Sequence, residues 1–324
     1  MRLYPNILVC LQVSLLRCWG ADVEIPKIYG YECCTGSPTI LPMVEGGTSR
    51  YQQVFDASMF TKTGDGLPPE GAFLTTLLYR AACDSLRGWF LTNLQINAST
   101  TLRKPDQLSS RFSDNLGLDD TRIFGPSNTI FETARTACVT ADHSINAYGD
   151  RGLSVSFLYV PSKGNLLLDF RNNGSLYSSF PMGPRPSAGR LDGSSNLIDG
   201  VSRAFAPSVD AEIAELVDTG GFAVGFYFSP IPKLRATIQT NTVELRWPTI
   251  PKEFRLQIAS SATGVVRWTD VTTAPVQDFG FWTLTIPITK NTKSPRYYRL
   301  FWDTPQPIVS LPSLNSTAAN SSPP

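Results

Sequence analysis

The most constraining feature of this sequence is the alternation of apolar and polar side chains over short segments. In LSVSFLYV, residues 153–160, Leu153, Val155, Phe157 and Tyr159 fall on one face of a strand, and two serines lie on the opposite face. A period of two is typical of a half-buried β-strand, because successive side chains in a strand point to opposite faces. The segment therefore predicts a strand with one face in a core.

The following segment, GNLLLDFRNNG at residues 164–174, places an acid and a base among leucines. One face of a strand here is apolar, and the other carries Leu167, Asp169 and Arg171. Asn-Asn-Gly then supplies residues that tolerate the positive φ of a tight turn. We interpret Asp169 and Arg171 as an exposed ion pair on the outward face, which contributes little to stability, and not as a catalytic pair.

Further strand candidates recur along the chain, bracketed by glycine and proline, at residues 50–55, 72–82, 88–100, 129–139 and 221–228. Only DAEIAELVD, residues 210–218, has helical spacing, with Asp210 as a candidate cap, and it also fits a loop turn. Many short strands and almost no helix predict an all-β fold, with a large jelly-roll-like β-sandwich over residues 25–231.

Proline-rich SPIPKL at residues 229–234 is typical of a linker. Four alternating segments behind it predict a small β-sandwich of immunoglobulin or fibronectin type III kind over residues 235–303. Its expected core is Leu245, Trp247, Leu256, Ile258, Trp282, Leu284 and Ile286, with Trp268 at one end. Residues 304–324 are rich in proline, serine and asparagine, and we expect them to be disordered.

Charge argues against a nucleic-acid partner. The chain has 28 Lys and Arg against 27 Asp and Glu, a net charge of +1, and its basic residues are scattered. Binding to phosphates needs a clustered positive surface. A nucleic-acid partner is therefore not expected.

The first 21 residues are expected to be a secretory signal peptide. Arg2 precedes an apolar run from Ile7 to Leu16, and the small residues Gly20 and Ala21 follow. LLRC also resembles a lipoprotein box ending at Cys18, but Arg17 stands where a small residue is expected. No later stretch is apolar over the length that a membrane helix needs. These features predict a secreted or cell-surface protein without a transmembrane anchor in the mature chain.

Four cysteines remain after removal of such a signal: Cys33, Cys34, Cys83 and Cys138. An even number in an exported chain is compatible with two disulfides. Adjacent cysteines form strained bridges, so we expect Cys33 and Cys34 to pair with Cys83 and Cys138 in an order that the sequence leaves open.

Two sets of motifs carry a resemblance to secreted proteins of environmental bacteria. TVELRWP, FRLQIASSATGVVRWTDV and RYYRLF, within residues 242–302, resemble a C-terminal fibronectin-like module of such proteins. SRYQQVFDASMF, LQINASTT, LSSRFSDNLGLDDTRIF, PSKGNLLLDFRNNG and DGVSRAF, within residues 49–205, resemble an extracellular β-sandwich often found with PEP-CTERM sorting tails. The sequence ends in SSPP, without the PEP motif. The resemblance implies export and fold, and it supplies no activity that could be transferred to this chain.

Candidate catalytic residues are sparse. His143 is the single histidine, so a Ser-His-Asp triad would have to use it, with Asp142, Ser144 or Asp150 nearby. No G-x-S-x-G motif is present, and we interpret His143 as a solvated loop residue. One histidine also excludes sites that need several histidines, such as H-E-x-x-H.

Carboxylates offer two alternatives. A pair among Asp114, Asp119, Asp120, Asp169 and Asp192 could hydrolyse a glycosidic bond, if their distances suit the reaction. Asp114, Asp119 and Asp120 could instead bind calcium, although the spacing does not match the EF-hand loop. No other cofactor is expected.

Aromatic residues near turns suggest a surface for sugars, which stack on exposed rings. The candidates are Trp89, Tyr148 and Tyr177. The sequence thus favours an exported, non-catalytic surface or extracellular protein that serves in adhesion, matrix or carbohydrate binding, with a polysaccharide or protein as partner. The alternative is a polysaccharide hydrolase or lyase that uses paired carboxylates.

Overall fold

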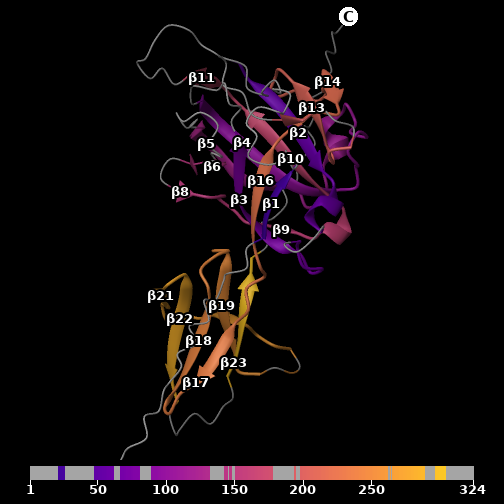
Figure 1. Ribbon diagram of the computed structural model, residues 1–324. Helices are drawn as coiled ribbons and strands as arrows, with labels where there is room; N and C mark the ends of the chain where they lie inside the picture. Colours follow the sequence, from indigo (N-terminus) through magenta and orange to yellow (C-terminus); the bar gives the residue numbers. More distant parts are fainter. Residues whose placement is uncertain are drawn as a thin grey trace, which may run out of the picture.

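The computed structural model confirms an all-β fold. It describes residues 21–25, 47–61, 66–80, 89–131, 142–144, 146–147, 150–177, 193–194, 198–261, 263, 265–288 and 296–303. Its strands form antiparallel sheets in two bodies, one above the other in Figure 1. Within the described residues, no helix is long and apolar enough to cross a membrane.

The larger body contains a nine-stranded sheet in the order β14-β13-β2-β10-β4-β5-β7-β8, with β11 beside β4. Its strands are β2 (Ser49–Phe55), β4 (Trp89–Thr101), β5 (Thr121–Phe131), β7 (Asn146–Ala147), β8 (Asp150–Arg151), β10 (Asn165–Asn172), β11 (Ser175–Tyr177), β13 (Val201–Ala206) and β14 (Leu216–Asp218). β10 lies between β2 and β4, so the segment with Asp169 is central in this sheet.

The second sheet of this body has the order β1-β16-β3-β6, with β9 also paired to β3. Its strands are β1 (Ala21–Ile25), β3 (Ala72–Arg80), β6 (Asp142–Ser144), β9 (Phe157–Tyr159) and β16 (Val224–Ser229). A short ribbon joins β12 (Gly193–Ser194) to β15 (Gly221–Phe222). A core of aliphatic and aromatic side chains unites the sheets. In that core Phe55 meets Phe226 edge to face at 4.9 Å.

The alternation in residues 153–160 correctly predicts the inward face. Phe157 and Tyr159 are buried in the core. The strand itself covers only Phe157–Tyr159, because the backbone N–H groups of Leu153 and Ser154 donate to Thr75 and Ile123 instead.

The segment 210–218 is not a helix: residues 210–215 form a loop turn, as the alternative had it, and Leu216–Asp218 form β14. Its backbone bonds leave the segment: Ala214 N donates to Ser110 O at 2.7 Å, and Glu215 N donates to Phe205 O at 2.9 Å. Ala214 is buried against the nine-stranded sheet. Tertiary packing has therefore overridden the helical spacing.

The smaller body has two sheets. One has the order β17-β18-β22-β21 and the other β20-β19-β23. The strands are β17 (Arg235–Ile238), β18 (Thr242–Pro248), β19 (Phe254–Ala259), β20 (Thr269–Asp270), β21 (Val276–Asp278), β22 (Phe281–Pro287) and β23 (Tyr297–Trp302). Of the expected core residues, Leu245, Trp247, Leu256 and Leu284 are buried together, and Trp282 and Ile286 pack against them.

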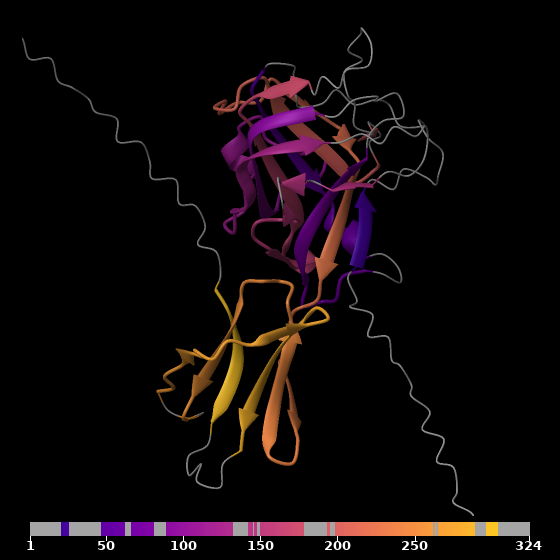
Figure 2. The ribbon, with the colours of Figure 1, turned by 90° about the vertical axis from the view of Figure 1, so that its left-hand side faces the viewer.

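Figure 2 shows the two bodies in a second view. Aromatic side chains join them. Phe73 of β3 lies 4.9 Å from Trp302 and 5.5 Å from Phe254, edge to face in both cases. Ser156 N also donates to Glu253 Oε1 at 2.8 Å. Phe73 is 1% exposed and lies outside the core of the larger body, so the smaller body contributes to its burial.

Candidate functional site

Asp169 is buried, and the expectation of an exposed ion pair is wrong. Its side chain is 1% exposed. Arg50 of β2 donates to both of its oxygens, from Nε to Oδ1 at 3.2 Å and from Nη2 to Oδ2 at 2.8 Å. Arg171 is the weaker partner, with Nη2 at 3.6 Å from Oδ2. The main partner of Asp169 is thus Arg50, from a distant segment of the chain, and the two form a buried bidentate ion pair.

A loop explains this burial. Residues 102–120 lie over the outward face of the nine-stranded sheet, and within them the 3₁₀ turn η2 (Phe112–Asn115) carries the buried Phe112. The Phe112 ring lies 4.6 Å from the Arg50 guanidinium carbon. Gln52 donates to Phe112 O at 3.1 Å and accepts from Asn115 Nδ2 at 3.0 Å. The face that alternation predicts to be exterior is therefore a second buried layer.

Asp120 is the last residue of this loop and lies close to Asp169. Its Oδ2 accepts from Asn97 Nδ2 at 3.0 Å, while its buried Oδ1 has no hydrogen-bond partner in the described part of the chain. Burial raises the pKa of Asp120 to about 6; the bond from Asn97 opposes this rise, and the charge of Asp169 adds to it. Two carboxylates with different surroundings thus lie close together.

This pair does not present an acid and a base to a substrate. A glycosidase needs both carboxyl groups against the scissile bond, and Asp169 is closed off from solvent with both oxygens bound to Arg50. The arrangement holds the loop on the sheet.

The expected calcium ligands are used within the loop. Asp114 Oδ2 accepts from Ser109 Oγ at 3.1 Å, and Asp119 Oδ1 accepts from Thr100 N at 2.7 Å. No group of three or more metal-binding side chains occurs in the described ranges. Calcium remains a prediction, to which this geometry gives no support.

Two of the three expected sugar-binding residues are neighbours. Tyr177 of β11 pairs with Trp89 of β4 in the antiparallel register. Their side chains lie outside the described atoms. Tyr148 and the expected disulfide residues Cys33, Cys34, Cys83 and Cys138 lie outside the described residues.

His143 is in a strand and not in a loop. It belongs to β6 and pairs with Tyr79 of β3. The flanking Asp142 and Ser144 share that strand.

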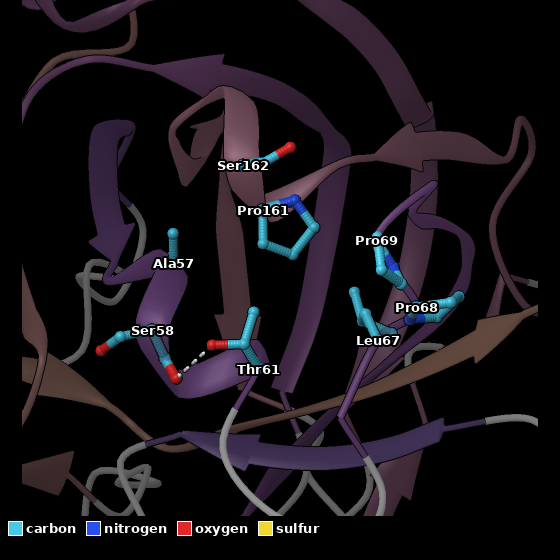
Figure 3. Close-up of a pocket in the computed structure, with 8 residues that line it drawn as sticks. All are labelled: Ala57, Ser58, Thr61, Leu67, Pro68, Pro69, Pro161 and Ser162. Atoms are coloured by element: carbon cyan, nitrogen blue, oxygen red, sulfur yellow. Dashed lines mark hydrogen bonds between the residues drawn. The ribbon is translucent and has the colours of Figure 1, made fainter.

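A hollow of about 450 Å³ lies at one end of the larger body (Figure 3). Two 3₁₀ turns, η1 (Ala57–Phe60) and η3 (Pro161–Lys163), and the segment 66–69 surround it. Its lining is Ala57, Ser58, Thr61, Leu67, Pro68, Pro69, Pro161 and Ser162. Prolines and a leucine form the walls, and hydroxyl groups lie among them.

Local chemistry shapes the walls of this hollow. Asp56 begins η1 and accepts from Ser58 N at 2.8 Å through Oδ1, as an N-cap does. Thr61 Oγ1 donates to Ser58 O at 3.1 Å (Figure 3). Gly71 has a φ of +83°, and a Cβ there would lie 2.3 Å from Tyr159 O. Only glycine allows the chain to turn so close to the next strand.

Three strongly exposed aliphatic side chains lie in loops of the larger body, outside the lining of the hollow. Leu102, Leu118 and Ile198 are 86%, 101% and 88% exposed. Asn165 links the segment of Leu102 to η1, because its Oδ1 accepts from Ala57 N and its Nδ2 donates to Arg103 O, both at 2.8 Å. On the other side Asp56 N donates to Gly200 O at 2.8 Å. We call the hollow with Leu102, Leu118 and Ile198 the loop end.

The loop end was not predicted from the sequence. Pro68-Pro69 and PSKG at residues 161–164 are visible as turn signals, but they lie in segments far apart in the chain. No titratable side chain occurs among the residues that line the hollow. An apolar hollow with a few hydroxyl groups suits binding better than acid–base chemistry.

Comparisons with protein-family models, with curated proteins and with solved structures found no match for this chain.

Proposed function

We propose that this is an exported, non-catalytic surface or extracellular protein that acts by adhesion, with the loop end as its contact surface. Loops at the end of a rigid sandwich commonly carry binding residues, because the sheets hold the shape while the loops vary. The smaller body serves as a docked spacer. Export is supported by the layout of residues 1–21.

One observation carries the proposal. The hollow is lined by proline, leucine, alanine, serine and threonine, whereas the carboxylate of Asp169 is closed beneath a loop. The lining of the hollow therefore offers contact area without a paired acid and base.

The ligand that fits the loop end best is a surface or matrix protein. Leu102, Leu118 and Ile198 expose aliphatic carbon, and apolar contacts surrounded by polar groups are typical of protein interfaces. Sugar sites instead depend on aromatic rings for stacking, and the hollow is lined by none. Carbohydrate is the competing ligand.

The test is retention of the full chain on immobilised cell-surface and matrix fractions, with one aliquot treated with protease and another with periodate. Loss of retention after protease is expected, and loss only after periodate would identify a carbohydrate ligand. The variant Ser162→Trp fills the hollow and should weaken retention. Ser260→Trp, at an exposed site of the smaller body, is the matched control and should not.

The alternative is a polysaccharide hydrolase or lyase. The raised pKa of Asp120 is the observation in its favour, and the closure of Asp169 by Arg50 is the observation against it. Release of reducing ends or unsaturated products from a polysaccharide panel, lost in Asp120→Asn, would establish this activity and contradict the proposal. We expect no turnover.

A further inference from the structure

The first described strand begins where the expected signal peptide ends. β1 pairs with β16 from Ala21 opposite Phe228 to Ile25 opposite Val224. Val23 is 8% exposed and belongs to the core of the larger body. Residues 21–25 therefore complete a sheet of the folded protein, and their loss would expose the edge of β16.

The residues just before β1 have the pattern that signal peptidases cleave. Gly20 and Cys18 are small and alternate with Trp19. Small side chains at the last and third-last positions of a signal are what the peptidase accepts, and the residue between them is free to be large. The apolar run Ile7–Leu16 ends a few positions upstream.

We propose that signal peptidase cuts the Gly20–Ala21 bond, so that Ala21 is the first residue of the mature protein. This inference rests on the proposed export. Water adds across the bond: Gly20 leaves as the carboxylate of the released peptide, and the nitrogen of Ala21 becomes an α-ammonium group. The site lies one residue before the boundary expected from the layout of the signal.

The structure limits the site from the downstream side. A cut after Ala21 would remove the pair with Phe228, and a cut after Val23 would remove a core side chain. A cut after Ala21 would also place Trp19 at the third-last position of the signal, where a small residue is required. Cleavage before Cys18, with lipid attached to it, is the competing outcome.

The experiment is intact-mass and N-terminal analysis of the full chain expressed in a Gram-negative host and recovered from periplasm and medium. A mature chain that starts at Ala21 is expected. Gly20→Leu should accumulate the uncut precursor, because the last signal position no longer holds a small side chain. Trp19→Leu is the matched control, and its product should also start at Ala21.

The outcomes separate this inference from export itself. A mature chain that starts at Cys18, Val23 or any residue other than Ala21 overturns the cleavage site and leaves export intact. Normal processing of Gly20→Leu overturns it as well. An uncut chain confined to the cytoplasm overturns both. Val23→Asp gives a second readout: it should be processed at Ala21 but unfold at lower urea concentration, because it alters the core and not the cut.

Discussion

Arg50 and Asp169 form a bidentate ion pair on the outward face of the nine-stranded sheet, with Nη2 2.8 Å from Oδ2 and Nε 3.2 Å from Oδ1. The loop 102–120 covers this pair and excludes water from the carboxylate. Removal of one partner would leave the other charge buried and uncompensated, which is costly.

Arg50→Met should therefore destabilise the protein by about 3–5 kcal/mol, the range for a broken buried pair. Urea denaturation measures the change. Glu212→Gln is the control, because Glu212 pairs with Arg111 at 3.6 Å with both side chains exposed, and such pairs contribute about 1 kcal/mol or less. Equal losses of unfolding free energy in the two variants would show that the Asp169 carboxylate is not buried away from water. The double variant Arg50→Met/Asp169→Leu should recover much of the loss.

Asp120 should make stability depend on pH. Its pKa is raised from 3.8 to about 6 in the folded protein, so the native state holds the proton more tightly than the unfolded chain does. The stabilising contribution is fully present below pH 3.8 and is lost as the pH rises through about 6. The difference in urea midpoint between the protein and Asp120→Asn should change across that window. A difference independent of pH between 4 and 8 would refute the assignment.

The aromatic junction should couple the two bodies. Phe73 lies between Phe254 and Trp302, and Phe73→Ala removes both contacts, at a cost of about 3–5 kcal/mol if the junction is as well packed as a core. We expect thermal unfolding to split into two transitions and small-angle scattering to show a broader range of shapes. Phe279→Ala, at a side chain that is 93% exposed, should change neither measurement.

Gly71 should be required for the shape of the hollow. Gly71→Ala meets both an unfavourable φ of +83° and Tyr159 O at 2.3 Å. Gly280→Ala is the matched control, since Gly280 has a φ of +79° and nothing within 4 Å of its added Cβ. The control should lose about 1 kcal/mol from backbone strain, and Gly71→Ala clearly more, by chemical denaturation. Equal losses would show that the close approach to β9 is unimportant.

Alternation along the chain predicts the strands and their inward faces well. Phe157, Tyr159 and the apolar face of β10 point into the core as expected, because a period of two is a local property. What covers the opposite face is not local. The partners Arg50 and Asp169 are 119 positions apart, and no spacing within GNLLLDFRNNG reveals the loop above them.

The site was harder to predict for the same reason. The hollow combines η1, η3 and the segment 66–69, and each is an ordinary turn in the sequence. The aspartates in the loop invited a calcium interpretation, because carboxylates close in sequence resemble a ligand set. In the structure Asp119 and Asp120 instead accept hydrogen bonds from Thr100 and Asn97.

The most direct test of the account is the retention of Leu118→Gln on the surface or matrix fraction that binds the unaltered protein. Leu118 is 101% exposed at the loop end, and Val265, in the smaller body, is 94% exposed, so Val265→Gln is the matched control for loss of an exposed aliphatic side chain. We predict that Leu118→Gln weakens retention about tenfold or more, since burial of a leucine on binding stabilises a complex by about 1.5–3 kcal/mol, and that Val265→Gln has no effect. Unchanged retention of Leu118→Gln, or equal losses in both variants, would contradict the loop end as the binding surface.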